Sequence, residues 1–316
     1  MMPLFGSRRS KKSLAVGIAS GQSGVAVVIM HCAKGERPRV VDCALLSSAP
    51  AELADYCRAH NLHQKPCVDS LPPERYALMP VEVQSLKPEE RLDAIRWQIR
   101  ELLEYPAADA VIDLINIPVF GSEDNIKNQI VAAPRAFLQE RVDLCKRLDL
   151  KLQTIDIAEF SLRNLLELYQ EDTRGLCFLW IRENSSLLIV TRGDIFYFSR
   201  LINTGLSQLN LPAATETEAP LSEILQQQLD TIVLEIQRSI DYCESNFRLP
   251  QIPRILVAVC GPESPLLLDY LNSYLQADVV WADFRQIFDL SLELDPPLIN
   301  ACLPALGAAL RAGGRA

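Results

Sequence analysis

The sequence lacks the features that mark several large protein classes. Its 316 residues contain no uninterrupted apolar run of the ~18 to 20 residues that a membrane-spanning helix needs. Residues 13–32 come closest, but the polar, glycine-bearing segment Ser20–Gly24 interrupts them. No long apolar stretch follows the N-terminal basic residues, so the start does not resemble a signal peptide. The formal net charge of -9 argues against general binding to nucleic acid. We expect a soluble, cytoplasmic protein.

Sequence motifs for nucleotide binding and hydrolase chemistry are also missing. There is no G-x-G-x-x-G, no G-x-x-x-x-G-K-[ST] and no G-x-S-x-G, so a dinucleotide fingerprint, a P-loop and a hydrolase nucleophile elbow are not present. Of only three histidines, His60 and His63 can share a helical face, but no third ligand lies near them. The nine cysteines form no C-x-x-C pair and sit mostly among apolar neighbours, which predicts reduced core residues. We predict no catalytic residue and no metal site.

A three-stranded pattern occurs twice, about half the chain apart. Short β-rich runs separated by glycine-bearing or polar turns predict one meander near the N-terminus and a second after the midpoint. The predicted strands are Leu14–Ile18, Val25–Met30 and Arg39–Leu46, and then Cys177–Ile181, Leu187–Thr191 and Ile195–Ile202. This repetition indicates two lobes that arose by internal duplication.

Alternating helices and short apolar strands follow each meander. Apolar residues at helical spacing predict helices over 88–105, 135–148, 158–169, 220–247 and 265–275. Residues 129–133, 152–157 and 255–259 are typical of short buried strands. An antiparallel start followed by parallel strand–helix units predicts an α/β protein with mixed sheets covered by helices.

Several segments, in order and spacing, resemble one known family. They are Leu4-Phe5 with the basic cluster Arg8, Arg9, Lys11 and Lys12, then Ala94–Trp97, Leu103–Pro106, Val131–Pro134, Asp156–Phe160 and Glu235–Tyr242. Over nearly the whole chain the sequence resembles the PilM family of type IV pilus assembly proteins. It is most similar to the MshI branch, which serves mannose-sensitive haemagglutinin (MSHA) pili.

The resemblance implies an actin-like (ribonuclease H-like) fold of two lobes, each opening with a meander. The first lobe is expected over 1–172, with an inserted subdomain at about 36–128. The second is expected over 173–316, with a long helix at about 220–247. The lobes should join near 170–176 and again at the C-terminal helix.

PilM-type members bind ATP between the lobes through two strand–turn–strand phosphate loops. Each loop carries an aspartate that helps hold magnesium, which requires hard oxygen ligands. The resemblance places Ala19 at the first aspartate position and Trp180 at the second, with Arg182 in place of a glycine. We therefore expect a degenerate ATP site, a protein that is not an enzyme (a pseudo-ATPase) and no required cofactor, with room only for weak ATP or ADP binding.

The adenosine side of the family motif carries over better, to Glu235 and Arg238 on the long helix and to Gly261, although Cys260 replaces a usual glycine. An ordinary i,i+3 ion pair explains Glu235 and Arg238 equally well. The remnant nucleotide site predicted from the resemblance comprises Gly21, Ser23, Asn184, Ser185, Glu235, Arg238 and Gly261.

The function implied by the resemblance is that of a scaffold. Family members lie at the cytoplasmic side of the inner membrane and bind the N-terminal cytoplasmic peptide of a single-span membrane protein. The pilus assembly ATPase is a further candidate partner, and the basic N-terminus a candidate contact with the membrane surface. Two alternatives remain at this stage: an active actin-like ATPase of pilus assembly, and a sugar-kinase-like enzyme of the same fold.

Overall fold

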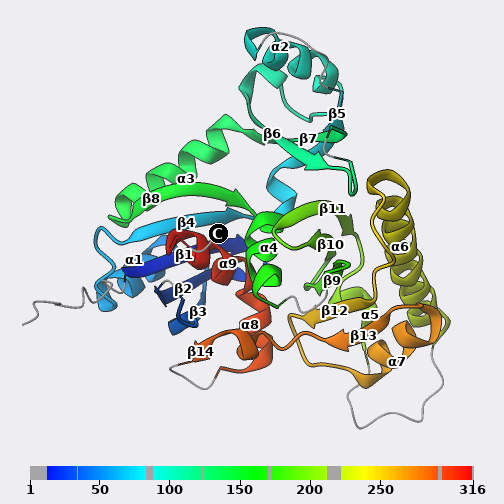
Figure 1. Ribbon diagram of the computed structural model, residues 1–316. Helices are drawn as coiled ribbons and strands as arrows, with labels where there is room; N and C mark the ends of the chain where they lie inside the picture. Colours follow the sequence, from blue (N-terminus) through cyan, green and yellow to red (C-terminus); the bar gives the residue numbers. More distant parts are fainter. Residues whose placement is uncertain are drawn as a thin grey trace, which may run out of the picture.

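Two sheets that share one five-strand pattern form the frame of the molecule, and the first has an additional edge strand, β14 (Figure 1). The computed structural model describes residues 13–33, 35–82, 88–122, 124–169, 173–211, 222–290 and 294–314. One sheet has the order β14-β3-β2-β1-β4-β8 and the other the order β11-β10-β9-β12-β13. In each, an antiparallel meander is followed by two parallel strands, so the sheets confirm the duplication predicted from the sequence.

The first sheet is built on a long hairpin. Strands β1 (Ser13–Gly21) and β2 (Gly24–Cys32) pair antiparallel, and β3 (Arg39–Leu46) completes the meander. Gly24 has a φ of +133°, and a Cβ there would lie 2.1 Å from the carbonyl oxygen of Leu46, so only glycine fits this turn. Strands β4 (Pro66–Leu71) and β8 (Lys151–Ile157) then add in parallel.

Strand β4 was not predicted, because it carries buried polar residues. Asp69 is fully buried, and Arg141 of helix α3 (Arg135–Arg147) donates to its carboxylate from Nε and Nη2 at 2.6 and 2.9 Å. A charged residue is buried only when it has a partner, and here the partner comes from a distant helix. The local sequence pattern therefore does not predict a buried strand at Asp69.

The second sheet repeats the arrangement. Strands β9 (Leu176–Ile181), β10 (Ser186–Arg192) and β11 (Ile195–Ile202) form the meander, while β12 (Arg254–Val259) and β13 (Asp278–Trp281) add in parallel. The long helix α6 (Glu223–Phe247) packs on β11 and beside α7 (Pro265–Tyr274). Its start is capped by the Ser222 hydroxyl, which accepts from the N–H of Leu225 at 3.2 Å.

A third, three-stranded sheet of order β5-β7-β6 is inserted between β4 and α3, at the top of Figure 1. Its strands are β5 (Ala77–Val81), β6 (Ala110–Pro118) and β7 (Ile126–Pro134). Helix α2 (Pro88–Ile99) covers one face and ends six residues before the predicted position 105. The predicted insertion range of 36–128 begins too early, because β3 and β4 of that range pair within the main sheet.

Two helices, α4 (Ala158–Tyr169) from the middle of the chain and α9 (Leu303–Ala312) from its C-terminal part, meet at the centre of the molecule. Helix α4 packs against β10 and β11 of the second sheet, and helix α9 packs against β1 and β4 of the first. They touch so closely that a Cβ on Gly307 would lie 1.7 Å from the carbonyl oxygen of Ser161. Each lobe therefore contributes a helix to the sheet of the other, and a linear division at 172/173 does not separate the two packing units.

The remaining elements connect these layers. They are α1 (Pro50–Ala59), α5 (Leu206–Leu209), α8 (Pro296–Ala301), β14 (Asp289–Leu290) and three short 3₁₀ turns, η1 (Pro73–Arg75), η2 (Ala107–Asp109) and η3 (Phe284–Ile287). Strand β14 returns to the first sheet and pairs with β3.

All nine cysteines are free thiols and eight are buried, as predicted. Within the described ranges, no helix has the length and apolarity needed to span a bilayer. The basic N-terminal cluster lies outside the described residues.

Candidate functional site

A cavity of about 310 Å³ lies between the two lobes, where their first hairpins face each other. The β1–β2 hairpin contributes Gly21 and Ser23 to its wall, and the end of β9 contributes Trp180, with Arg182 following. The end of β4 and helices α8 and α9 close the other sides. The duplication explains why the cavity lies here. The two lobes have equivalent first hairpins, and these hairpins face each other where the lobes meet.

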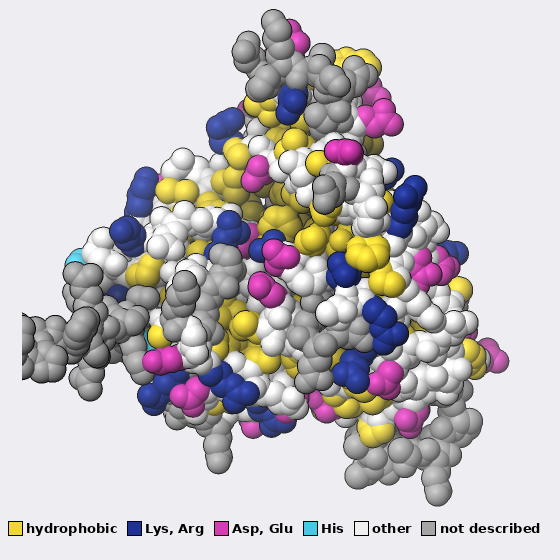
Figure 2. All heavy atoms as spheres, in the orientation of Figure 1, with side chains coloured by type: hydrophobic (Ala, Val, Ile, Leu, Met, Phe, Trp, Pro, Cys, Tyr) yellow, Lys and Arg dark blue, Asp and Glu magenta, His cyan; other side chains and the backbone are white. Residues whose placement is uncertain are grey.

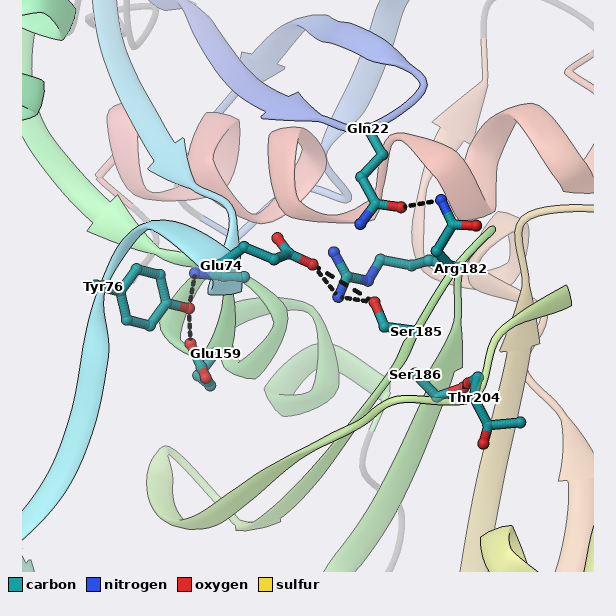
Figure 3. A network of polar contacts seen from close by, with 10 residues as sticks. Gln22, Glu74, Tyr76, Glu159, Arg182, Ser185, Ser186 and Thr204 are labelled. Carbon is teal, nitrogen blue, oxygen red and sulfur yellow. Dashed lines mark hydrogen bonds and ion pairs between the residues drawn. The ribbon is translucent and has the colours of Figure 1, made fainter. Parts of the chain in front are cut away.

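Arg182 occupies the loop of the second lobe and bridges to the first (Figure 3). Its Nη2 lies 2.7 Å from Oε1 of Glu74, in η1 of the first lobe, and donates to the Ser185 hydroxyl at 2.6 Å. The Arg182 side chain is only 9% exposed. Its guanidinium also lies over the Trp180 ring, 5.2 Å from the centroid. Arg182, the cation that the described residues place in the cavity wall, is thus already paired with a carboxylate.

A second contact joins the two hairpins at the rim of the cavity. Asn184 donates from Nδ2 to Oε1 of Gln22 at 2.8 Å, and its own Oδ1 accepts from the hydroxyl of Ser207 at 3.0 Å. Gly205 allows the chain after β11 to come close behind this loop, since a Cβ there would lie 2.4 Å from the backbone nitrogen of Ser185. The N–H groups of Leu206 and Ser207 then bond to the carbonyls of residues 182 and 183.

The two positions that the resemblance assigns to metal-organising aspartates hold buried apolar side chains. Ala19 is 7% exposed and Trp180 5% exposed. The Trp180 indole N–H donates to the backbone oxygen of Asn300 at 2.9 Å, which fixes the ring against α8. Among the residues described, no group of three or more His, Cys, Asp or Glu side chains is arranged to hold a metal ion.

A buried carboxyl, Glu159, lies at the start of α4 beside the cavity (Figure 3). The Tyr76 hydroxyl donates to it, and so does the Ser199 hydroxyl at 3.1 Å. Burial raises the pKa of the Glu159 carboxyl above its ordinary value of 4.5, while these hydrogen bonds and the charge of Arg182 oppose the rise. The same burial and the neighbouring carboxylate raise the pKa of Tyr76 well above 10.0. This pair ties the base of the insert to the second sheet.

Glu235 and Arg238 do not line the cavity. Glu235 accepts from Nη1 of Arg200 on β11 at 2.6 Å and from Nη1 of Arg238 at 3.1 Å. The Arg238 side chain is 65% exposed. The structure thus places this pair in an ion network between α6 and β11, which fits the ion-pair alternative and separates both residues from the other predicted site residues.

The other predicted residues do come together. Gly21 and Ser23 line the cavity, while Asn184 and Ser185 bond to its rim and to Arg182. Gly261 follows Cys260, a cavity residue, and a Cβ on Gly261 would lie 2.9 Å from Cδ1 of Leu206. Sequence reasoning missed Gln22 and Glu74, the two first-lobe partners of the second loop. No motif marks them, because their roles depend on which residues face them across the cleft.

The insert presents a second surface of interest on the sheet face turned away from α2. Residues alternate between faces along each strand, and those facing α2 form a small core of their own. That core comprises Ile95, Ile99, Ile112, Leu114, Ile130 and Ala132. The opposite face carries Val111, 38% exposed, with Ile115 and Val131 partly buried. Figure 2 shows hydrophobic side chains gathered in a hollow below the insert.

Gln129 lies on this same face of the insert. It is 8% exposed, and its Oε1 atom has no hydrogen-bond donor among the described residues. A buried acceptor without a partner costs stability, and this oxygen has almost no accessible surface, so a molecule outside the chain does not reach it in this arrangement.

Comparison with known proteins relates this architecture to solved structures. A chain of a PilM–PilN type IV pilus biogenesis complex is similar with a TM-score of 0.69 and 19% identity, over 95% of this chain and 98% of that one. The cytoplasmic domain of EpsL, an inner-membrane component of the Vibrio cholerae type II secretion system, is similar with a TM-score of 0.50 and 11% identity, over 94% of both chains. A Bacteroides thetaiotaomicron protein of actin-like ATPase fold and unknown function also gives 0.50, at 8% identity, over 88% of this chain and 94% of that one. No family model matches, and neither does any curated protein.

Proposed function

We propose that this protein, whose fold is actin-like, is a scaffold of a type IV pilus assembly machinery. In this role it binds the N-terminal cytoplasmic peptide of a single-span inner-membrane protein. The observation that carries the proposal is the likeness to the PilM–PilN chain, which extends over 95% of this chain and 98% of that one. The likeness to cytoplasmic EpsL, from another inner-membrane assembly, supports the same class of role. The MSHA-type assignment to the MshI branch is the finer part of this proposal and rests on the sequence resemblance alone.

The cleft supports a binding role without nucleotide turnover. A magnesium–nucleotide complex needs oxygen ligands for the metal and uncompensated positive charge or N–H groups for the phosphates. Here Ala19 and Trp180 stand at the positions that the resemblance assigns to the metal-organising aspartates, and the wall residue Arg182 is paired with Glu74 at 2.7 Å. These residues do not fit magnesium–ATP, so we propose a protein that is not an enzyme and needs no cofactor.

The insert offers a surface that suits an extended peptide. Strands β5 and β6 are the two edges of the order β5-β7-β6, and the face opposite α2 carries the exposed side chain of Val111. A peptide of about ten residues can dock on such a surface by strand addition and side-chain contacts, with no catalytic group.

The protein would thereby sit at the cytoplasmic side of the inner membrane through its partner. The peptide pays an ordering entropy on binding, so we expect micromolar affinity, roughly -8 kcal/mol. Several partners held on one membrane complex would raise the effective affinity. The assembly ATPase is a further partner consistent with this role.

The test is a titration of the full chain with the N-terminal cytoplasmic peptide of the single-span protein encoded beside it, followed by calorimetry. Val111→Lys should weaken peptide binding about 5-fold or more, because it places a charge on the exposed apolar face of the insert.

A matched control comes from the other side of the insert. Leu102 is 66% exposed, so Leu102→Lys makes the same kind of change away from the proposed surface and should leave the affinity unchanged. Absence of binding at high micromolar peptide, together with normal pilus assembly in a strain lacking this protein, would refute the scaffold proposal.

A further inference from the structure

The chain enters the insert through a short segment that also forms part of the cavity wall. Residues 72–76 connect β4 to β5 and include the turn η1. Pro72 and Pro73 line the cavity, and Pro73 is buried. Each proline ring fixes its own φ, so this segment has little backbone freedom with which to absorb a displacement. A movement at the cavity is therefore passed on toward β5.

Two side chains of this segment reach the second half of the molecule at different places (Figure 3). Glu74 pairs with Arg182 of the β9–β10 loop at 2.7 Å. Tyr76, two residues further on, donates its hydroxyl to Glu159 and accepts the N–H of Ala158 at 3.2 Å. Both of these last partners lie at the start of α4, which packs against the second sheet. One short segment thus contacts the rim of the cleft and the helix beside the sheet.

The contact of Tyr76 continues into the second sheet itself. Glu159 also accepts from the Ser199 hydroxyl of β11 at 3.1 Å. The Glu159 residue is only 3% exposed, so water does not readily replace these hydrogen bonds. Separating the start of β5 from β11 would leave buried polar groups without partners, which costs stability.

The other edge strand of the insert is attached to the second lobe as well. Ile117 of β6 and the following Val119 are 0% and 2% exposed and belong to the same core as the second sheet. The N–H of Phe120 donates to the backbone oxygen of Phe247, at the end of α6, at 2.9 Å. The guanidinium of Arg192 lies over the Phe120 ring, 4.3 Å from its centroid. The insert is therefore held to the second lobe at the start of β5 and at the end of β6.

The insert is joined to the first lobe in another way. The chain passes from β4 into the insert and returns from β7 into α3. Beside these two crossings, Arg75 lies over the ring of Phe137 in α3, 4.5 Å from its centroid, but Arg75 is exposed to solvent. Exposed cation–π contacts are weak compared with buried hydrogen bonds and core packing. Of the contacts described, those to the second lobe are the harder to break.

We propose that residues 72–76 couple the interlobe cleft to the insert, so that opening of the cleft and reorientation of the insert against the first sheet are one motion. When the second lobe moves, Glu74 follows Arg182, and Tyr76 carries the start of β5 with it. A partner that changes the cleft thereby changes how the insert presents its surface. Only this regulatory consequence rests on the proposed peptide binding, because the coupling itself concerns the free chain.

Hydrogen exchange of the full chain, followed by mass spectrometry, can read one end of the coupled path while the other end is changed. Arg182→Met removes the charge at the cleft and should raise exchange in β5 about 5-fold or more, because β5 then opens more easily. Tyr76→Phe changes the insert end and should raise exchange in the loop 182–185 by a similar factor, because coupling between two sites is reciprocal. The Arg182 N–H, bonded to the Ser185 carbonyl at 2.9 Å, is the protected amide of that loop.

Two matched controls make the same chemical changes elsewhere in the second lobe. Arg254→Met breaks the surface pair with Asp278, which spans 3.5 Å. Tyr270→Phe removes the hydroxyl that donates to Asp230 at 2.6 Å. Both controls should leave exchange in β5 and in the loop 182–185 at wild-type rates. Strand β2 serves as an internal reference in all four variants and should exchange as in the wild type, which excludes general destabilisation.

Purely local effects would overturn the proposal. These are Arg182→Met raising exchange in the loop 182–185 while β5 keeps its wild-type rate, and Tyr76→Phe raising exchange in β5 alone. Equal rises in the two controls would overturn it as well, since the path through residues 72–76 would then not be specific. If Arg182→Met does not fold, the response of the loop 182–185 to Tyr76→Phe decides by itself. No peptide is used, so a failure of the scaffold proposal leaves this result intact.

Discussion

Nη2 of Arg182 lies 2.7 Å from Oε1 of Glu74, and this ion pair joins the β9–β10 loop of the second lobe to the segment after β4 in the first. Together with the hydrogen bond from Asn184 to Gln22, it connects the lobes across the mouth of the cleft. The positive charge of Arg182 is thus balanced across the cleft by a carboxylate of the chain itself, and no bound ligand is needed to balance it.

A double-mutant cycle on this pair should give a coupling energy of about 1–2 kcal/mol in denaturant unfolding. Arg182→Met and Glu74→Gln each leave a partner without its counter-charge, and Arg182 is 9% exposed while Glu74 is 33% exposed, so solvent screens the pair only in part. The surface pair Arg254–Asp278, at 3.5 Å, is the control and should give less than about 0.5 kcal/mol. Equal couplings for the two pairs would contradict a structural role of the Arg182–Glu74 bridge.

Magnesium–ATP should not bind to the wild-type chain with micromolar affinity, and no magnesium-dependent hydrolysis should occur. Ala19 and Trp180 stand where the metal-organising carboxylates of the resembled family would be, and Glu74 already neutralises Arg182. Calorimetry with magnesium–ATP and a phosphate-release assay measure both quantities. Tight binding that is lost in Glu235→Ala or Arg238→Ala would contradict the proposed degenerate site.

Glu159 should make the protein less stable as the pH rises above about 4.5. Burial raises the folded-state pKa of this carboxyl above its ordinary value of 4.5. Below pH 4.5 both states hold the proton; above it the unfolded chain loses the proton first, so the free energy of unfolding falls until the folded pKa is passed. Each pKa unit between the two values corresponds to about 1.4 kcal/mol.

Glu159→Gln isolates this effect, because it keeps an acceptor for Tyr76 and cannot ionise. The free energy of unfolding of Glu159→Gln, relative to that of the wild type, should increase as the pH rises from 4 to 8, as measured by urea unfolding. Tyr76→Phe removes a hydrogen bond that lowers the pKa of Glu159. The free energy of unfolding of this variant should therefore decrease more with rising pH than that of the wild type. A difference between Glu159→Gln and wild type that does not vary with pH would refute the raised pKa.

Gly307→Ala should destabilise the protein by about 2 kcal/mol or more, although alanine is favoured over glycine in helices by about 1 kcal/mol. A Cβ at this position would lie 1.7 Å from the carbonyl oxygen of Ser161, so α4 and α9 would have to separate. Gly21→Ala is the control: its nearest neighbour to the added Cβ is 4.0 Å away, and a change below about 0.5 kcal/mol is expected. A stabilised Gly307→Ala variant would disprove the close helix contact.

Most of the fold followed from local patterns in the sequence. The two meanders, the helix over 158–169 and the strand over 255–259 agree with β1–β3, β9–β11, α4 and β12 within a few residues. Their apolar spacing reports which side chains face the core, and that spacing is a property of each segment by itself. The repeated pattern also indicated the two-lobed, duplicated organisation.

Local sequence patterns did not determine where the insert begins. Strand β4 contains Asp69 and Ser70, which are buried because Arg141 and Ser161 bond to them from α3 and α4. The resemblance predicts that the insert begins at about 36, although the small sheet begins at Ala77. Helix α2 ends at Ile99 although apolar spacing continues, and Leu103 packs against the insert core from a turn.

The sequence alone determined that residues 19 and 180 carry no carboxylate, since that depends only on which side chains are present. Tertiary structure decided what takes their place. Arg182 meets Glu74 from 108 positions earlier in the chain (182 minus 74), and Glu235 turns to Arg200 and away from the cavity. The first partnership depends on how the two lobes approach each other, and the second on how α6 packs on β11. Packing of whole sheets and helices sets that approach, and no local pattern encodes it.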